Sequence, residues 1–120
     1  MKPNWKELAS KAIASLSQNE REASIAYIEQ RVIPAGEVIE LSGINQSFNE
    51  PVVIAFIDLE PMLNWTHRAC YLIMSAGGGI LLKLDVDTPP FLVRVSPYLR
   101  LIHKGSKAPD WSAATFAMIR

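Results

Sequence analysis

The sequence lacks three features: a second cysteine, a run of basic residues and a long apolar segment. One cysteine among 120 residues cannot form an internal disulfide, which favours a reducing compartment and predicts a cytoplasmic protein. Lys and Arg together number 12, as do Asp and Glu, and no basic cluster is present, so nucleic acid is not expected as a partner. No window approaches the roughly 18 consecutive apolar residues of a membrane helix, so no membrane association is expected either.

Apolar residues are abundant relative to charged ones. They make up 49% of the chain, against 20% for charged residues, and the net charge is zero. A chain of this length can bury a core without metals or disulfides. The apolar surplus therefore indicates either an efficiently buried core or an apolar patch covered by a partner, for which a homodimer is the commonest form.

The N-terminal region has helical periodicity. Asn4 and Glu7 have the spacing of a capping box, and Ser17 and Glu20 repeat it. We expect a first helix ahead of Ser17 and a second from Ser17 until Pro34 stops it, although one bent helix also fits. The apolar stripe of the first helix recurs at intervals of three and four residues: Trp5, Leu8, Ala9, Ala12, Ile13 and Leu16.

The middle of the chain changes to strand patterns. Residues 52–59 are apolar at almost every position and lie between Pro51 and Pro61, which is typical of a central strand covered on both faces. Residues 77–79 are three glycines between two β-rich runs, a pattern that predicts a hairpin. Residues 42–50 are expected to form a polar loop. The expected strands cover residues 37–41, 52–59, 69–75, 80–85, 91–95 and 98–103.

These elements predict an α+β fold in a single domain over residues 1–120. We expect an N-terminal helical segment packed on an antiparallel sheet of four to six strands. Pro109 and Asp110 mark the start of a short C-terminal helix. The expected architecture is similar to that of cystatin-like rolls, in which a curved sheet wraps around a helix; this comparison concerns architecture alone.

The segment from Asn64 to Tyr71 is the first place to look for function. Trp65, His67 and Arg68 are expected in a loop between two strands, where a rigid scaffold positions reactive or recognition groups. Cys70 follows inside an apolar run, which favours a buried small hydrophobe over a nucleophile paired with His67. His67 is interpreted either as a loop-shaping residue or as a ligand contact, and His103 as a solvated surface residue.

The acidic residues form two close pairs, Asp58 with Glu60 and Asp85 with Asp87. A spacing of two puts both members of a pair on one face of a strand, and adjoining strands would bring the two pairs together, with His67, into an oxygen-rich metal site. Exposed acids at strand ends are the simpler interpretation, so neither a metal nor a cofactor is expected. The candidate ligand- or partner-binding residues are Trp65, His67, Arg68, Asp58, Glu60 and Asp85.

Two functions remain open. The first is a small cytoplasmic, non-enzymatic interaction module that self-associates or binds another protein, with the Trp65–His67 loop as its recognition surface. The alternative is a small hydrolase or lyase, or a metabolite-binding pocket, in which His67 acts with Glu60, Asp58 or Asp85 and Trp65 forms a wall. No catalytic residue is assigned, because the sequence completes no catalytic motif.

Overall fold

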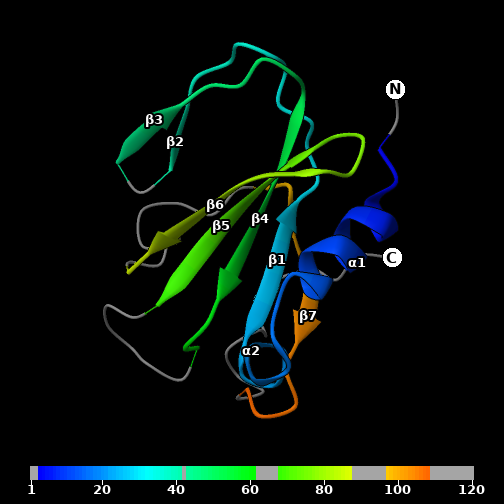
Figure 1. The fold of residues 1–120 in the computed structure, drawn as a ribbon, viewed down its shortest axis with the longest axis vertical. Coiled ribbons are helices and arrows are strands. Elements are labelled where there is room, and N and C mark those ends of the chain that lie inside the picture. Colours follow the sequence, from blue (N-terminus) through cyan, green and yellow to red (C-terminus); the bar gives the residue numbers. More distant parts are fainter. Residues whose placement is uncertain (1–2, 42, 62–67, 88–96, 109–120) are drawn as a thin grey trace.

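The fold combines two N-terminal helices with a five-stranded antiparallel sheet (Figure 1). The computed structural model describes residues 3–41, 43–61, 68–87 and 97–108. The strand order is β6-β5-β4-β1-β7, and β2 and β3 form a separate small sheet. The elements are α1 (Trp5–Ala14), α2 (Gln18–Ala23), β1 (Ile25–Glu29), β2 (Ile39–Leu41), β3 (Ile44–Gln46), β4 (Val52–Asp58), β5 (Ala69–Ser75), β6 (Ile80–Val86) and β7 (Leu99–Lys104).

The α+β class is therefore confirmed, with an N-terminal helix packed on an antiparallel sheet whose strand number lies in the expected range. The predicted strand at 91–95 and the C-terminal helix beginning at Pro109 lie outside the described residues. The likeness to cystatin-like rolls stays a prediction.

The two helices begin where the sequence predicts. The Asn4 side chain accepts a hydrogen bond from the backbone N–H of Glu7 at 3.1 Å. At α2 the capping box is complete, since the Ser17 hydroxyl accepts from the N–H of Glu20 and the Glu20 carboxylate accepts from the N–H of Ser17. The predicted break near Ser17 is confirmed. Within the described part of the chain, no helix has the length and apolar character needed to cross a bilayer.

The predicted extent of the second helix is wrong. The helix ends at Ala23, Ser24 takes an extended conformation, and β1 then runs through the centre of the sheet between β4 and β7. Ile25 and Tyr27 pack on one face of the sheet while Ala26 and Ile28 pack on the other. Because both faces are buried, the strand has no apolar–polar alternation, and the wider spacing of its large residues resembles a helical stripe.

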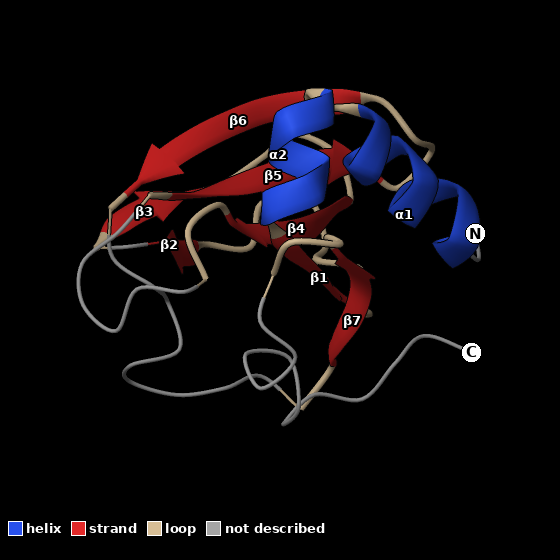
Figure 2. Cartoon of the chain, turned by 90° about the horizontal axis from the view of Figure 1, so that it is seen from below, coloured by secondary structure: helices blue, strands red, loops and turns tan. Residues whose placement is uncertain are grey.

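One face of the sheet packs against α1 and the turn that follows it (Figure 2). Leu8 and Ala12 of α1 and Leu16 after it are buried, and they cover the side chains of three neighbouring strands. The strand residues of this face, which we call the helix face, are Ala26, Ile28, Val53, Ala55, Ile57, Cys70, Leu72 and Met74.

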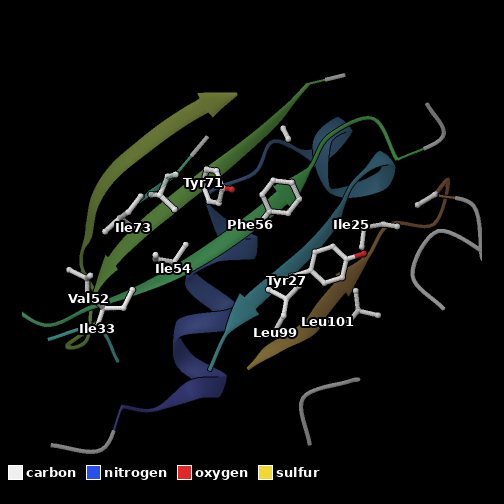
Figure 3. Close-up of a cluster of buried hydrophobic side chains, with 13 residues drawn as sticks. Ile25, Tyr27, Ile33, Val52, Ile54, Phe56, Tyr71, Ile73, Leu99 and Leu101 are labelled. Carbon is white, nitrogen blue, oxygen red and sulfur yellow. The ribbon is translucent and has the colours of Figure 1, made fainter. Parts of the chain in front are cut away.

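The opposite face, which we call the aromatic face, is also buried (Figure 3). Tyr27, Phe56 and Tyr71 form a row across β1, β4 and β5, with ring centroids 6.4 Å apart for the first pair and 5.4 Å for the second. Ile33, Val52 and the other apolar residues of this cluster surround the row. Burial on both faces confirms β4 as a central strand.

The small β2–β3 hairpin corrects a second prediction. Residues 44–46 were expected in a polar loop, but they pair with β2 in antiparallel register, Ile39 opposite Gln46. Gly43 has a φ of 80°, a left-handed conformation that glycine adopts without strain. The strand is short and its residues are largely exposed, so its sequence gives little strand signal.

Candidate functional site

Four charged side chains line a cleft of about 310 Å³. Glu20 comes from α2, Arg68 from the residue before β5, and Lys83 and Asp85 from β6. Leu59, Ala69 and Val86 complete the wall. We call this the charged cleft. Two of its members, Arg68 and Asp85, were predicted as site residues.

The register of the β5–β6 hairpin explains why these side chains meet. Lys83 lies opposite Leu72 and Asp85 lies opposite Cys70, so both project from the helix face. Arg68 precedes Cys70 by two residues and follows the same alternation. The α2 capping box then holds Glu20 at the other side of the cleft. Two acids and two bases are thus gathered at one end of the sheet.

The charges in the cleft attract one another without close contact. The pKa of the Glu20 carboxyl is lowered, mainly by the hydrogen bond from the backbone N–H of Ser17 and additionally by the positive charges of Lys83 and Arg68. Among the described residues, no ion pair within 4.0 Å joins any two of the cleft's charged groups. Their side chains therefore keep hydrogen-bonding capacity for a partner.

The only cysteine lies on the helix face of β5, opposite Asp85 of the cleft. Cys70 is fully buried, and burial raises the pKa of its thiol to about 11. A thiol with such a pKa is protonated at neutral pH, whereas a nucleophilic cysteine needs a lowered pKa. The prediction of a buried core cysteine is confirmed.

Asp58, Glu60 and Arg68 hold together the two ends of the connection between β4 and β5. The Asp58 carboxylate accepts a hydrogen bond from the N–H of Glu60 at 3.1 Å, and the Glu60 carboxylate accepts one from the N–H of Arg68 at 2.6 Å. The N–H of Leu59 donates to the carbonyl of Arg68 at 3.1 Å. The predicted site residues Asp58 and Glu60 therefore make structural hydrogen bonds where β4 ends and β5 begins.

Asp58 and Asp85 do not converge. They lie on strands separated by β5, and their partners on that strand are adjacent residues, Ala69 for Asp58 and Cys70 for Asp85. Adjacent strand residues point to opposite faces, so the Asp58 and Asp85 carboxylates do too and do not share a site. Asp58 instead faces Tyr27, whose pKa is raised by burial and, to a smaller extent, by the Asp58 charge.

Three groups of residues remain. They are the predicted residues that the structure does not describe, His103, and the cleft residues that the sequence analysis missed. Trp65 and His67 lie outside the described residues. His103, expected as a solvated surface residue, is half-buried, and its Nε2 lies 2.6 Å from the carbonyl oxygen of Arg21 at the end of α2. Glu20 and Lys83 were not predicted. The alternation within β6 puts Lys83 on the same face as Asp85, without marking it as a site residue, and nothing local connects Glu20 with them.

Comparison of the chain with protein-family models, with curated proteins and with solved structures gave no match.

Proposed function

We propose that this protein is a small, cytoplasmic, non-enzymatic interaction module that self-associates as a homodimer. The charged cleft, together with the predicted Trp65–His67 loop, is its recognition surface. The single observation that carries the proposal is the composition of β6. Its charged side chains Lys83 and Asp85 are exposed and form no ion pair within the described part of the chain, whereas Leu82, Leu84 and Val86 extend the buried core to the edge of the sheet.

The exposure of β6 supports self-association. The strand is seven residues long and, in the described part of the chain, no strand lies on its outer side. Ile80 is 49% exposed and Leu81 is 43% exposed. A long edge strand with free backbone groups and exposed apolar residues is a template for pairing with another chain.

The chemistry of the described residues favours binding over catalysis. The Cys70 thiol is buried and protonated at neutral pH. The Glu60 carboxylate is engaged by the backbone of Arg68, and Asp58 by that of Glu60. Two of the three carboxylates proposed to assist His67 thus have structural hydrogen bonds, while the exposed charges of the cleft are arranged to meet a partner of mixed charge.

Sedimentation equilibrium from low to high micromolar concentration tests the proposal. We expect a reversible association with a limiting mass twice that of the 13.3 kDa chain. A single species of monomer mass throughout that range would overturn it.

A small-molecule site is the second candidate, because the volume of the cleft is near the lower end of ligand pockets, about 300 Å³. In this alternative the cleft belongs to a small hydrolase or lyase, or binds a metabolite, with His67 acting beside Asp85. A screen with small ester and phosphoester substrates tests it. Turnover that the His67→Ala variant loses at an unchanged melting temperature supports this alternative, and equal rates in both proteins contradict it.

A further inference from the structure

We infer that two copies of this chain pair through β6, antiparallel and in one register centred on Leu84. Lys83 of each copy then lies opposite Asp85 of the other, and the two sheets continue into one. This inference rests on the proposed self-association and names its surface and register. In Figure 1, β6 forms one border of the sheet.

The hydrogen-bond pattern of the hairpin shows which backbone groups of β6 point outward. The N–H of Ala76 donates to Pro51 and the carbonyl of Arg68 accepts from Leu59, so the even-numbered residues of β5 face β4. The odd-numbered residues of β5 therefore face β6, where they bond to their register partners Leu84 and Val86. The N–H and C=O groups of Lys83 and Asp85 consequently point away from β5, outward from the edge of the sheet.

The charge pattern of β6 selects one register. Antiparallel partners share a face of the sheet, so Lys83 can pair with Asp85 or with another odd-numbered residue. A register centred on Lys83 or on Asp85 puts two like charges directly opposite each other, which is destabilising. The register centred on Leu84 places opposite charges together twice, related by the two-fold axis. The strand is thus complementary to a second copy of itself.

The apolar residues of β6 agree with the same register. Leu82, Leu84 and Val86 are half-buried and pack against the aromatic-face cluster at its margin. In the paired sheet, Leu84 meets Leu84 of the second copy and Leu82 meets Val86, so the two cores join and the exposed parts of these side chains leave water.

The other edge strand does not have this property. β7 contains Arg100, His103 and Lys104 and no acidic residue. An antiparallel pairing of β7 with itself therefore offers no pair of opposite charges. Of the two edges in the described sheet, only β6 is self-complementary.

Pairing through β6 also completes the charged cleft. The two-fold axis stands perpendicular to the sheet, so the helix faces of both copies lie on the same side. Lys83 and Asp85 of the second copy then continue the row of charges that starts at Glu20 and Arg68. The recognition surface is therefore shared between two chains.

Charge exchange tests the register. The Lys83→Glu variant places two acids opposite each other at both symmetric positions, and the Asp85→Lys variant does the same with two bases. We expect each to weaken the dimer roughly tenfold or more. Mixing the two variants restores opposite charges at both positions, so a mixed dimer should form with near wild-type affinity, detectable by native mass spectrometry. If the wild type dimerises and both variants do so equally well alone, the register is wrong while self-association stands.

A disulfide provides a second test. In the proposed dimer, Leu84 lies opposite Leu84 of the second copy at a non-hydrogen-bonded position, where the two Cα atoms are closest. The Leu84→Cys variant should therefore form an intermolecular disulfide under mild oxidation. Leu82→Cys is the matched control, since Leu82 faces Val86 and should cross-link far more slowly. Cys70 is buried and does not compete. Equal cross-linking of both variants overturns the inference, and a wild type that is monomeric throughout overturns the proposed function with it.

Discussion

The backbone N–H of Gly105 donates a hydrogen bond to the carbonyl oxygen of Ser24 at 2.8 Å. This contact joins the end of β7 to the junction between α2 and β1. The backbone N–H of Lys107 donates to the carbonyl oxygen of Glu22 at 2.8 Å, and the Lys107 ammonium lies 3.1 Å from the Glu22 carboxylate. Two segments far apart in the sequence thus meet backbone to backbone, which holds α2, and with it Glu20, in place.

The close approach at Gly105 leaves no room for a side chain. A Cβ there would collide with the backbone carbonyls of Glu22 and Arg21. We expect Gly105→Ala to lower the free energy of unfolding by roughly 1 to 3 kcal/mol. Urea denaturation measures this. Gly79→Ala is the control, because a Cβ at Gly79 meets nothing within 4 Å; an equal loss in both variants would contradict the role of the contact.

Replacement by alanine should affect stability differently at the two serines that flank α2. The Ser17 hydroxyl caps the helix, so Ser17→Ala should cost about 1 kcal/mol. The Ser24 hydroxyl is fully buried and, within the described structure, has no hydrogen-bond partner. Because burying an unpaired hydroxyl is unfavourable, Ser24→Ala should leave the melting temperature unchanged or raise it. A clear fall in the melting temperature of Ser24→Ala would show that this hydroxyl has a partner.

The Glu60 carboxylate should stabilise the β4–β5 connection. Removing it in Glu60→Ala deletes the bond to the N–H of Arg68, and we expect a loss of about 0.5 to 1.5 kcal/mol in the free energy of unfolding. Glu50→Ala removes another glutamate side chain, which is exposed, and serves as the control. Chemical denaturation of the two variants at neutral pH compares them, and equal stabilities would indicate that the hydrogen bond contributes nothing.

The buried thiol predicts how stability depends on pH. Burial raises the pKa of Cys70 from 9.0 to about 11. Below pH 9 the thiol is protonated in both the folded and the unfolded chain, so its contribution is fully present. Between pH 9 and 11 only the unfolded chain loses the proton, and the free energy of unfolding falls. In the Cys70→Ala variant the free energy of unfolding should fall less over this range. Identical slopes of the free energy of unfolding against pH in the two proteins would mean that the thiol is accessible to water.

The sequence predicts those elements that have strong local signals. Pro51 and Pro61 bound a run too short and too apolar for anything but a central strand, and the glycines at 77–79 mark the hairpin that sets the register of β6. β1 could not be predicted in this way, because Ile25 to Ile28 are buried on both faces and show no period of two.

The candidate site was predictable only in part. Arg68 and Asp85 were predicted individually, and the hairpin register brings them near each other. Glu20 reaches the same cleft from α2, whose position depends on contacts such as that between Gly105 and Ser24. Such contacts between distant segments cannot be predicted from the spacing of residues in the sequence.

Amide hydrogen exchange of β6, followed residue by residue at low and at high protein concentration, tests pairing through this edge most directly. The N–H groups of Leu84 and Val86 bond to β5 and should be protected at both concentrations. Those of Lys83 and Asp85 point outward and should exchange rapidly in the dilute sample and slowly in the concentrated one. Rapid exchange of Lys83 and Asp85 at every concentration would contradict the pairing of two copies through β6.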